Sequence, residues 1–347
     1  MPFTIVRNDI TSMRVDAIVN TANPYPVIGD GTDRAIYEKA GAELLAERKK
    51  IGKIAPGQAV ITPAFNLDAD FVIHTVGPVW IDGKHREEEI LEECYINSLA
   101  LANQNKCKSV AFPLISTGTY NFPKDRALRI ATKAISRFVL EYNIMVYLVV
   151  FDKTSYSLSE KLFDEIESYI DNNYAGEQLR KEYRRDTRGS ERLREESITH
   201  KSADLSEEAV VDAVAMFGIV GAASFKDTDW EDFPLEKTFS EMLLQLIEAK
   251  GMTHAQAYRK ANIDRKHFNK IKNNKNYKPT KYTAIAFAIA LELTLSQTKE
   301  LMETAGLALS KSNLFDVIVS FFIENKRYDV FELNEVLFEY DLPLLGC

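Results

Sequence analysis

The sequence predicts an α/β fold in its first half and an all-helical fold in its last third. In residues 1–174, short runs rich in Val and Ile alternate with stretches of helical periodicity, a pattern typical of a mostly parallel sheet sandwiched between helices. From residue 239 onward the pattern is helical only. A charged stretch separates the two regions, and a length of 347 residues is that of about two domains.

Six short apolar runs in the first region are predicted to be buried strands. They cover residues 3–7, 16–20, 58–63, 70–76, 109–114 and 144–151. Helices are predicted between them, over residues 33–41, 87–104, 123–142 and 157–170. In sheets of this kind ligands bind beyond the carboxyl ends of the strands, where we expect the functional site.

Residues 175–236 are predicted to be a charged linker between two domains, 1–174 and 237–347. The linker contains an apolar segment, residues 209–225, which is either a helix that docks on one of the domains or part of an incompletely ordered linker. Seven helices are predicted after it. The first five, within residues 239–306, each begin at or just after a Ser, Thr or Asp cap, and two of them end at Gly. The last two, 314–323 and 330–340, are candidates for dimerisation or for covering the core of this domain.

Composition excludes several classes of protein. With 46% hydrophobic and 27% charged residues, the chain is unlike disordered, collagenous or membrane-embedded proteins. No apolar run reaches the roughly 20 residues of a membrane-spanning helix, and the N-terminus has no apolar core of signal-peptide length. The three cysteines form no zinc spacing. We expect a cytoplasmic protein with no membrane partner, no metal and no cofactor.

Two loops carry the strongest functional signal, because each follows a predicted strand and precedes a predicted helix. In the first, Gly29 and Gly31 allow the backbone to approach a ligand at a helix N-terminus, where free N–H groups favour an anion. Asn23 and Asp33 flank these glycines. The second loop, residues 116–120, offers hydroxyl and N–H donors to phosphate oxygens. Two such loops on one sheet predict a bound diphosphate.

The first half of the chain resembles the macrodomain family, on motifs that recur in order. They are NDIT (8–11), DAIVNTANPYPVIGDGTDRAI (16–36), GQAVITPAFNL (57–67), VIHTVGPVW (72–80), FPLISTGTYNFP (112–123) and VVFD (149–152). The resemblance implies a three-layer α/β/α fold with a mixed, mostly parallel sheet. It also implies binding of ADP-ribose, and it is nearest to the hydrolases that remove single ADP-ribose units from proteins.

The resemblance assigns roles to individual residues. Asn23 corresponds to the asparagine that orients the distal ribose and Asp33 to the aspartate of the catalytic loop. Asp9 corresponds to the residue that binds the adenine amino group and Phe151 to the aromatic that stacks on adenine. The remaining ADP-ribose contacts are expected from Ile10, Asn20, Gly29, Asp30, Gly31, Thr32, Ser116, Thr117, Gly118, Thr119, Tyr120 and Asp152.

The sequence also departs from the family pattern. Ile28 and Asp30 interrupt the usual run of glycines in the first loop, and Asn121 stands where glycine is usual. A carboxylate near a diphosphate weakens anion binding unless it points at the ribose hydroxyls.

The implied reaction cleaves the bond between the anomeric carbon of the distal ribose and a carboxylate side chain of a target protein. Asn23 would hold the ribose and Asp33 would position a water molecule. Deprotonation of that water by Asp33 would require the carboxyl to be desolvated, because an ordinary Asp, with a pKa of about 3.9, is a weak base at pH 7. The substrate's own phosphate is an alternative base.

Simpler roles exist for several of these residues. Asp33 could be only a helix N-cap, Asn23 only a turn residue, and Phe151 only a core residue. His74, flanked by apolar residues, is predicted to be a hydrogen-bonded core histidine. Cys94 and Cys107 are expected to pack in the core and His85 to be exposed.

The C-terminal helices resemble the repressor-type helix-turn-helix family. The unit would be residues 253–274, and nine Lys or Arg between residues 258 and 281 face one acid, Asp264. Residues 237–312 carry 13 Lys/Arg against 6 Asp/Glu, net +7, in a chain of net charge −8. Nucleic-acid contacts are predicted from Arg265, Lys266, His267, Asn269, Lys270 and Lys272.

The sequence leaves three functions open. The first is an ADP-ribosyl hydrolase that its helical domain targets to nucleic acid. The second is a reader that binds ADP-ribose without turnover. The third is a DNA-binding regulator that senses ADP-ribose. A homodimer is compatible with each of them.

Overall fold

The computed structural model describes residues 2–151, 158–173 and 237–346. Residues 1–174 and 237–347 form one compact unit, to which all the described residues belong. Asp152, Cys347 and the linker 175–236 with its apolar segment lie outside the described residues. Among the helices that are described, none is long and apolar enough to cross a membrane.

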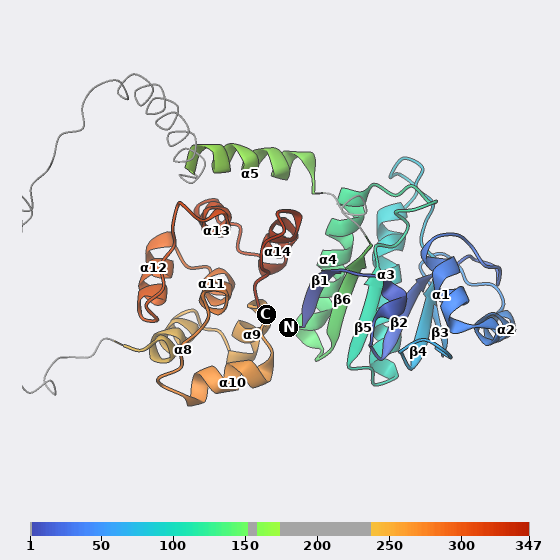
Figure 1. The fold of residues 1–347 in the computed structure, drawn as a ribbon, viewed down its shortest axis with the longest axis horizontal. Helices are drawn as coiled ribbons and strands as arrows, with labels where there is room; N and C mark the ends of the chain where they lie inside the picture. The colour runs from blue at the N-terminus through green and yellow to red at the C-terminus, as the bar shows by residue number, and fades with distance from the viewer. Residues whose placement is uncertain (1, 152–157, 174–236, 347) are drawn as a thin grey trace, which may run out of the picture. The chain divides into compact units, whose positions relative to one another are not determined.

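A six-stranded sheet, in the order β1-β6-β5-β2-β4-β3, forms the centre of the first half (Figure 1). The strands are β1 (Phe3–Arg7), β2 (Ala17–Thr21), β3 (Ala59–Pro63), β4 (Phe71–Thr75), β5 (Ser109–Pro113) and β6 (Met145–Val150). All neighbours pair in parallel except β3 and β4, which are antiparallel. This confirms the predicted mixed, mostly parallel sheet, and each predicted strand is present.

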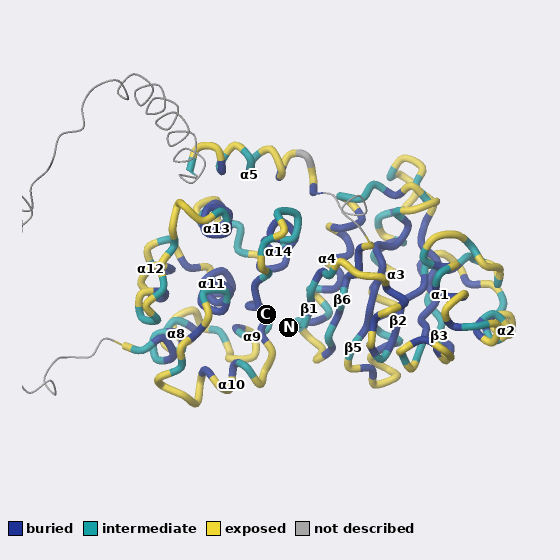
Figure 2. The backbone as a smooth tube through the Cα atoms, viewed as in Figure 1, coloured by how far each residue is buried: buried dark blue, intermediate teal, exposed yellow. Residues whose placement is uncertain are grey.

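Helices cover both faces of the sheet, which makes three layers. They are α1 (Thr32–Ala40), α2 (Ala42–Ile51), α3 (Glu87–Gln104), α4 (Lys124–Glu141) and the short 3-10 helix η1 (Ile10–Ser12). Ala17 and Val19 of β2 belong to the apolar cluster that contains α3 and α4 residues, whereas Ile18 belongs to the cluster with α1 and α2 residues. Because successive side chains of a strand point to opposite faces, the two helix layers lie on opposite sides. The central strands β2, β4, β5 and β6 are mostly buried as a result, whereas the edge strands β1 and β3 are less so (Figure 2).

Helix α2 was not predicted. Its sequence, AELLAERKKI, is dominated by charged side chains, and its buried residues are Leu44 and Arg48. An arginine on the buried side of a helix breaks the apolar periodicity on which the prediction depends. This omission matters because Arg48 lies close to the functional site.

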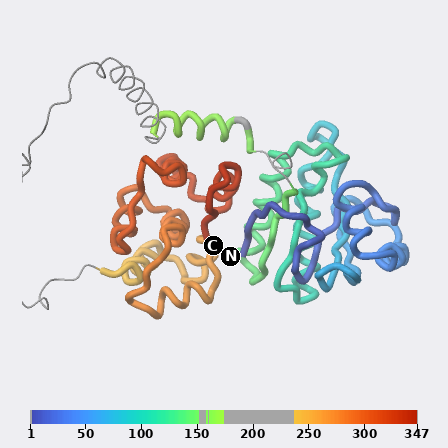
Figure 3. The backbone as a smooth tube through the Cα atoms, in the orientation of Figure 1, coloured from blue at the N-terminus to red at the C-terminus, as the bar shows by residue number. Residues whose placement is uncertain are grey.

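The C-terminal region is all-helical, as predicted (Figure 3). Its helices are α8 (Phe239–Ala249), α9 (His254–Lys260), α10 (Arg265–Asn273), α11 (Lys281–Ala290), α12 (Leu295–Glu303), α13 (Leu314–Glu324) and α14 (Val330–Glu339). The side chains of Thr238, Thr253, Asp264, Thr280 and Thr294 cap the first five, each by accepting a backbone N–H. Helices α13 and α14 are largely buried and cover the core of this region.

The C-terminal helices also contact the edge strand β1. The side-chain oxygen of Asn262 accepts the Phe3 N–H at 3.1 Å, and its amide donates to the Phe3 carbonyl at 2.8 Å. The carboxylate of Asp341 binds Arg7 at 2.7 Å. Helix α5 (Glu160–Asn173), assigned from the sequence to the first domain, contacts α13, and its Tyr169 hydroxyl donates to Glu324 at 2.8 Å. These contacts cover the polar backbone of an otherwise open sheet edge.

Candidate active site

Two adjoining cavities lie beyond the carboxyl ends of β2, β5 and β6. The first has a volume of about 520 Å³ and the second of about 420 Å³. Both are lined by Gly31, Thr32, Leu114 and Thr117, so the two loops predicted from the sequence form the boundary between them.

The predicted residues divide between the two cavities. Asn23, Gly29, Asp30, Gly31, Thr32, Asp33, Ser116, Thr117, Gly118, Thr119 and Tyr120 line the first. Asp9, Ile10 and Phe151 line the second. Asn20 lines neither cavity. Lys124, at the start of α4, lines the first and was not singled out from the sequence, where it is one of many lysines.

Asp33 is the buried carboxylate of the first cavity. Its side chain is 2% exposed; one oxygen accepts the Gly29 N–H at 2.5 Å and the other accepts the Asn20 amide at 2.7 Å. Burial raises the pKa of the Asp33 carboxyl above its ordinary value, against the opposing effects of Gly29, Asn20 and Arg48. The N-cap residue of α1 is Gly31, so no side chain caps the start of this helix. Asp33 is therefore not a simple helix cap.

A chain of hydrogen bonds anchors Asp33 to the sheet. Asn20, on β2, lies opposite His74, on β4, and the Asn20 amide is 3.2 Å from His74 Nδ1. The other ring nitrogen is 3.0 Å from the Thr62 hydroxyl. Burial lowers the pKa of His74 to about 3, so the ring is neutral. If Asn20 donates to Nδ1, then Nε2 carries the proton. His74 is thus the predicted core histidine, and Asn20 supports Asp33 rather than facing the cavity.

Gly29 lies next to both Asn23 and Asp33. A methyl group added at Gly29 would lie 2.7 Å from the Asn23 amide nitrogen and 3.2 Å from the Asp33 carboxylate. The Asn23 amide donates to the Val27 carbonyl at 3.3 Å. Position 29 therefore requires glycine, because any larger residue would push apart the Asn23 and Asp33 side chains that line the first cavity.

The first loop ends at the N-terminus of α1. Gly31 has a φ of 58°, a left-handed conformation that glycine adopts without strain. Asp30 forms an exposed ion pair with Arg34 at 2.8 Å. The extra carboxylate is therefore partly neutralised by a neighbour on the same helix turn.

The second loop is held by its own backbone bonds. Ser116 and Asn121 have φ values of 65° and 52°, and the Phe122 N–H donates to the Ser116 carbonyl at 3.0 Å. Asn, like glycine, tolerates this left-handed conformation, which explains how it can replace the usual glycine at 121. The Ser116 hydroxyl is buried and has no hydrogen-bond partner among the described residues.

The second cavity ends at an exposed aromatic ring. Phe151 is 74% exposed, so the alternative that it belongs to the core is wrong. Asp9 caps the short helix η1, because one of its oxygens accepts the Thr11 N–H at 2.8 Å. A ring and a carboxylate at the mouth of one cavity suit the stacking and hydrogen bonding of a base.

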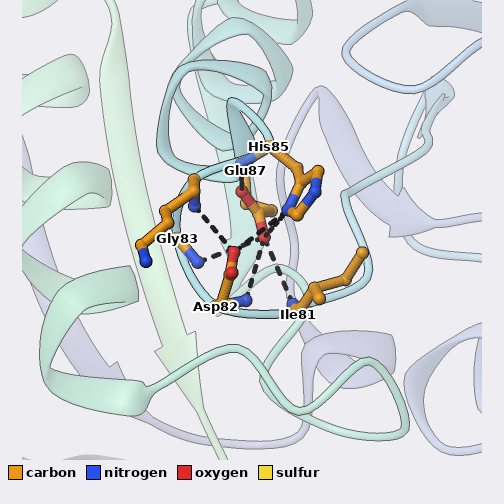
Figure 4. A network of polar contacts seen from close by, with 6 residues as sticks. Ile81, Asp82, Gly83, His85 and Glu87 are labelled. Atoms are coloured by element: carbon orange, nitrogen blue, oxygen red, sulfur yellow. Dashed lines mark hydrogen bonds and ion pairs between the residues drawn. The ribbon is translucent and has the colours of Figure 1, made fainter.

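Among the described residues, one group has the composition of a metal site: Asp82, His85 and Glu87. Figure 4 shows that Glu87 is directed at the backbone of its own loop. One oxygen accepts the N–H groups of residues 81, 82 and 83 at 3.2–3.3 Å, and the other accepts that of His85 at 2.6 Å. These bonds lower the pKa of Glu87 to about 2 although burial opposes them. The cluster therefore organises a loop, and His85 is exposed as predicted.

The predicted nucleic-acid contacts lie on α10. Arg265, Lys266, Asn269, Lys270 and Lys272 are exposed, and none of these four cations forms an ion pair with a described residue. His267 differs, because its ring is half-buried and lies 2.7 Å from the Tyr277 hydroxyl. Other cations of the basic segment are engaged: Arg259 donates to the Leu140 carbonyl, and Lys260 pairs with Glu292.

Comparison with known proteins agrees with this geometry. A family model described as Macro domain matches residues 19–131. An O-acetyl-ADP-ribose deacetylase of Escherichia fergusonii is 45% identical over 167 residues, which are 46% of this chain and 94% of that protein. One of Salmonella newport is 46% identical, over 46% of this chain and 93% of that protein. The chain belongs to the macrodomain family.

Solved macrodomains are also similar to the first half of the chain. A mutant macrodomain of Oceanobacillus iheyensis with ADPR is 39% identical and covers 47% of this chain and 92% of its own, with a TM-score of 0.44. A Trypanosoma brucei macrodomain in complex with ADP-ribose is 32% identical. The match covers 47% of this chain and 69% of the Trypanosoma chain, with a TM-score of 0.42. The match to the macrodomain family model ends at residue 131 and does not reach the C-terminal helices. The helix-turn-helix resemblance of residues 253–274 therefore stays a prediction.

Proposed function

We propose that the macrodomain hydrolyses esters of ADP-ribose. The observation that carries the proposal is Asp33, a buried carboxylate that contacts the Asn23 loop in a cavity that adjoins the one ending at Phe151. Adenine would stack on Phe151, the diphosphate would lie along the two loops, and the distal ribose would lie at Asn23. The similarity to O-acetyl-ADP-ribose deacetylases supports an ester as the substrate.

Asp33 would act on the water that attacks the ester. Its buried carboxyl has a raised pKa, which makes it a better base near neutral pH than an exposed Asp. Each carboxylate oxygen has two lone pairs, and the bonds from Gly29 and Asn20 use one on each. A water bound to a remaining lone pair would lose a proton to Asp33 as it attacks the carbonyl carbon of the ester. The bond between that carbon and the ribose oxygen would break, and the ribose oxygen would leave as a hydroxyl by taking the proton back from Asp33. The bond cleaved in this step is the acyl–oxygen bond rather than the bond to the anomeric carbon. Both O-acetyl-ADP-ribose and ADP-ribosylated Glu or Asp side chains present such an ester.

The direct test is release of ADP-ribose by the purified full-length protein. Two substrates are needed, O-acetyl-ADP-ribose and a protein mono-ADP-ribosylated on Glu or Asp. Release by the wild type and its loss in the Asn23→Ala/Asp33→Ala double variant would support the proposal and identify the preferred ester. No release from either substrate, with ADP-ribose binding intact by calorimetry, would instead favour the reader or sensor.

Phe151→Ala is expected to weaken ADP-ribose binding by about 5- to 150-fold, because stacking of a base on an aromatic ring contributes about 1–3 kcal/mol. The ring is exposed, so the thermal unfolding midpoint should stay that of the wild type. Calorimetry with ADP-ribose and with ribose 5-phosphate separates the two ends of the site: only the first ligand should lose affinity. An unchanged affinity for ADP-ribose would place adenine elsewhere.

We propose as a second function that α10 binds nucleic acid through its four cations that form no ion pair with a described residue. Lys266→Gln/Lys270→Gln is expected to weaken binding to duplex DNA and to reduce the salt dependence, the slope of log K against log salt, by about 2. Lys275→Gln is the matched control, since Lys275 already pairs with Glu241 at 3.3 Å. Fluorescence anisotropy in a salt series measures both quantities. A salt slope near zero in the wild type would remove this function.

A further inference from the structure

Arg48 of α2 is a buried charge. It is 1% exposed, and it forms no ion pair with any described Asp or Glu. Burial lowers the pKa of its guanidinium. A buried charge without a paired counter-ion destabilises a fold unless its donors are used, so the contacts of Arg48 require an explanation.

The guanidinium N–H groups of Arg48 donate to backbone carbonyls in two separate segments of the chain. The guanidinium donates to the Gly52 carbonyl at the end of α2, to the Asn23 carbonyl at 3.3 Å and to the Pro24 carbonyl at 3.4 Å. Arg48 therefore links the end of a helix to the turn that presents the Asn23 side chain to the cavity. A forked, planar group suits this bridge better than the single ammonium of a lysine.

Its charge acts on Asp33. Arg48 is the cation whose charge opposes the effect of burial on the Asp33 carboxyl. The other ionisable groups that act with these two are Tyr37 of α1, Tyr120 of the second loop and His74 of β4. Burial raises the pKa values of both tyrosines and lowers that of His74, so all three are neutral near pH 7. Arg48 lines neither cavity, so it acts without touching the ligand.

We propose that Arg48 is a positioning residue for the ester hydrolysis: its hydrogen bonds to the Asn23 and Pro24 carbonyls hold in place the turn that presents Asn23 to the cavity. The proposal rests on the proposed hydrolase function. It assigns a catalytic effect to a residue outside the cavity.

Three variants of the full-length protein test it. Arg48→Met removes the charge and the bridge, Arg48→Lys keeps the charge but not the fork, and Lys49→Gln changes an exposed neighbour on the same helix. For each variant we would measure kcat and KM with the preferred ester, the Kd for ADP-ribose, and thermal unfolding. We would also follow the titration of Asp33 by carbon-13 NMR of labelled aspartate side chains, with Asp33→Asn to assign the signal.

The expected pattern separates position from charge. Arg48→Met should lower kcat by about 10- to 100-fold, since misplacement by about 1 Å can reduce a rate that far, and should move the Asp33 titration to higher pH. Its Kd for ADP-ribose should stay within about threefold. In Arg48→Lys, Asp33 should titrate as in the wild type, but kcat should lie between those of Arg48→Met and the wild type. Lys49→Gln should match the wild type in both measurements.

Other outcomes would overturn the proposal. A folded Arg48→Met with kcat within twofold of wild type would show that Arg48 only packs. If Arg48→Met does not fold, Arg48→Lys decides: wild-type kcat would remove the bridging role. If the wild type hydrolyses neither ester, the hydrolase function fails, while the NMR titration still tests whether Arg48 controls Asp33.

Discussion

Asp33→Asn is expected to reduce ester hydrolysis by about 100- to 1,000-fold, in the range of a lost general base. The asparagine has the same shape, so it can still accept the Gly29 N–H, and ADP-ribose affinity should change by only a few-fold. Steady-state kinetics and calorimetry on the same preparation would show this separation. Asp68→Asn, at an exposed aspartate that pairs with Arg14, is a suitable control.

The pH dependence gives an independent test of the same residue. Hydrolysis requires ionised Asp33, so activity falls as pH decreases through the pKa of its carboxyl. Because burial raises that pKa, the acid limb of the kcat profile should lie above the ordinary aspartate value of about 3.9. An acid limb at or below that value would contradict a desolvated base and favour the substrate phosphate as the base. An Asp33→Asn protein with wild-type kcat would remove Asp33 from the reaction.

Asn262→Ala is expected to lower the free energy of unfolding by about 2–6 kcal/mol. The substitution leaves the buried N–H and carbonyl of Phe3 without partners, at about 1–3 kcal/mol each. It also places alanine at a φ of 55°, which adds strain. Guanidinium unfolding followed by circular dichroism would measure the loss.

Asn262→Gly separates the two contributions, because glycine removes the carboxamide but adopts a positive φ without strain. It should therefore lose the hydrogen-bond part only. Amide exchange at Phe3 should accelerate in both variants. Wild-type unfolding of Asn262→Ala would mean that the contact between β1 and the C-terminal helices adds nothing to stability.

Much of the fold was predictable because its signals are local. The strands were found from short Val- and Ile-rich runs, and the C-terminal helices from Thr and Asp caps that do accept backbone N–H groups. Helix α2 was missed because Arg48 occupies a buried position that the apolar pattern assigns to a hydrophobic residue. The contact between α5 and α13 could not be predicted, since the two helices lie far apart in the sequence.

The candidate site shows the same division. The sequence by itself predicted which two loops meet, because the order of strands and the residue types of the loops can be read along the chain. The family resemblance added Asp9 and Phe151, and the structure places these two residues in a cavity next to that of Asn23 and Asp33. The sequence could not show that Asp33 is buried, since burial depends on residues from β2, β4 and α2 that surround it.

Only the tertiary structure decided the contacts of Asn20 and Arg48. Asn20 turns away from the cavity because the register of β2 on β4 sets it opposite His74. Arg48 reaches the Asn23 turn because it lies on the buried side of α2, where its guanidinium donates to the Asn23 carbonyl. The electrostatic state of a carboxylate depends on the solvent excluded from it and on the charges brought near it, and both are properties of the folded chain.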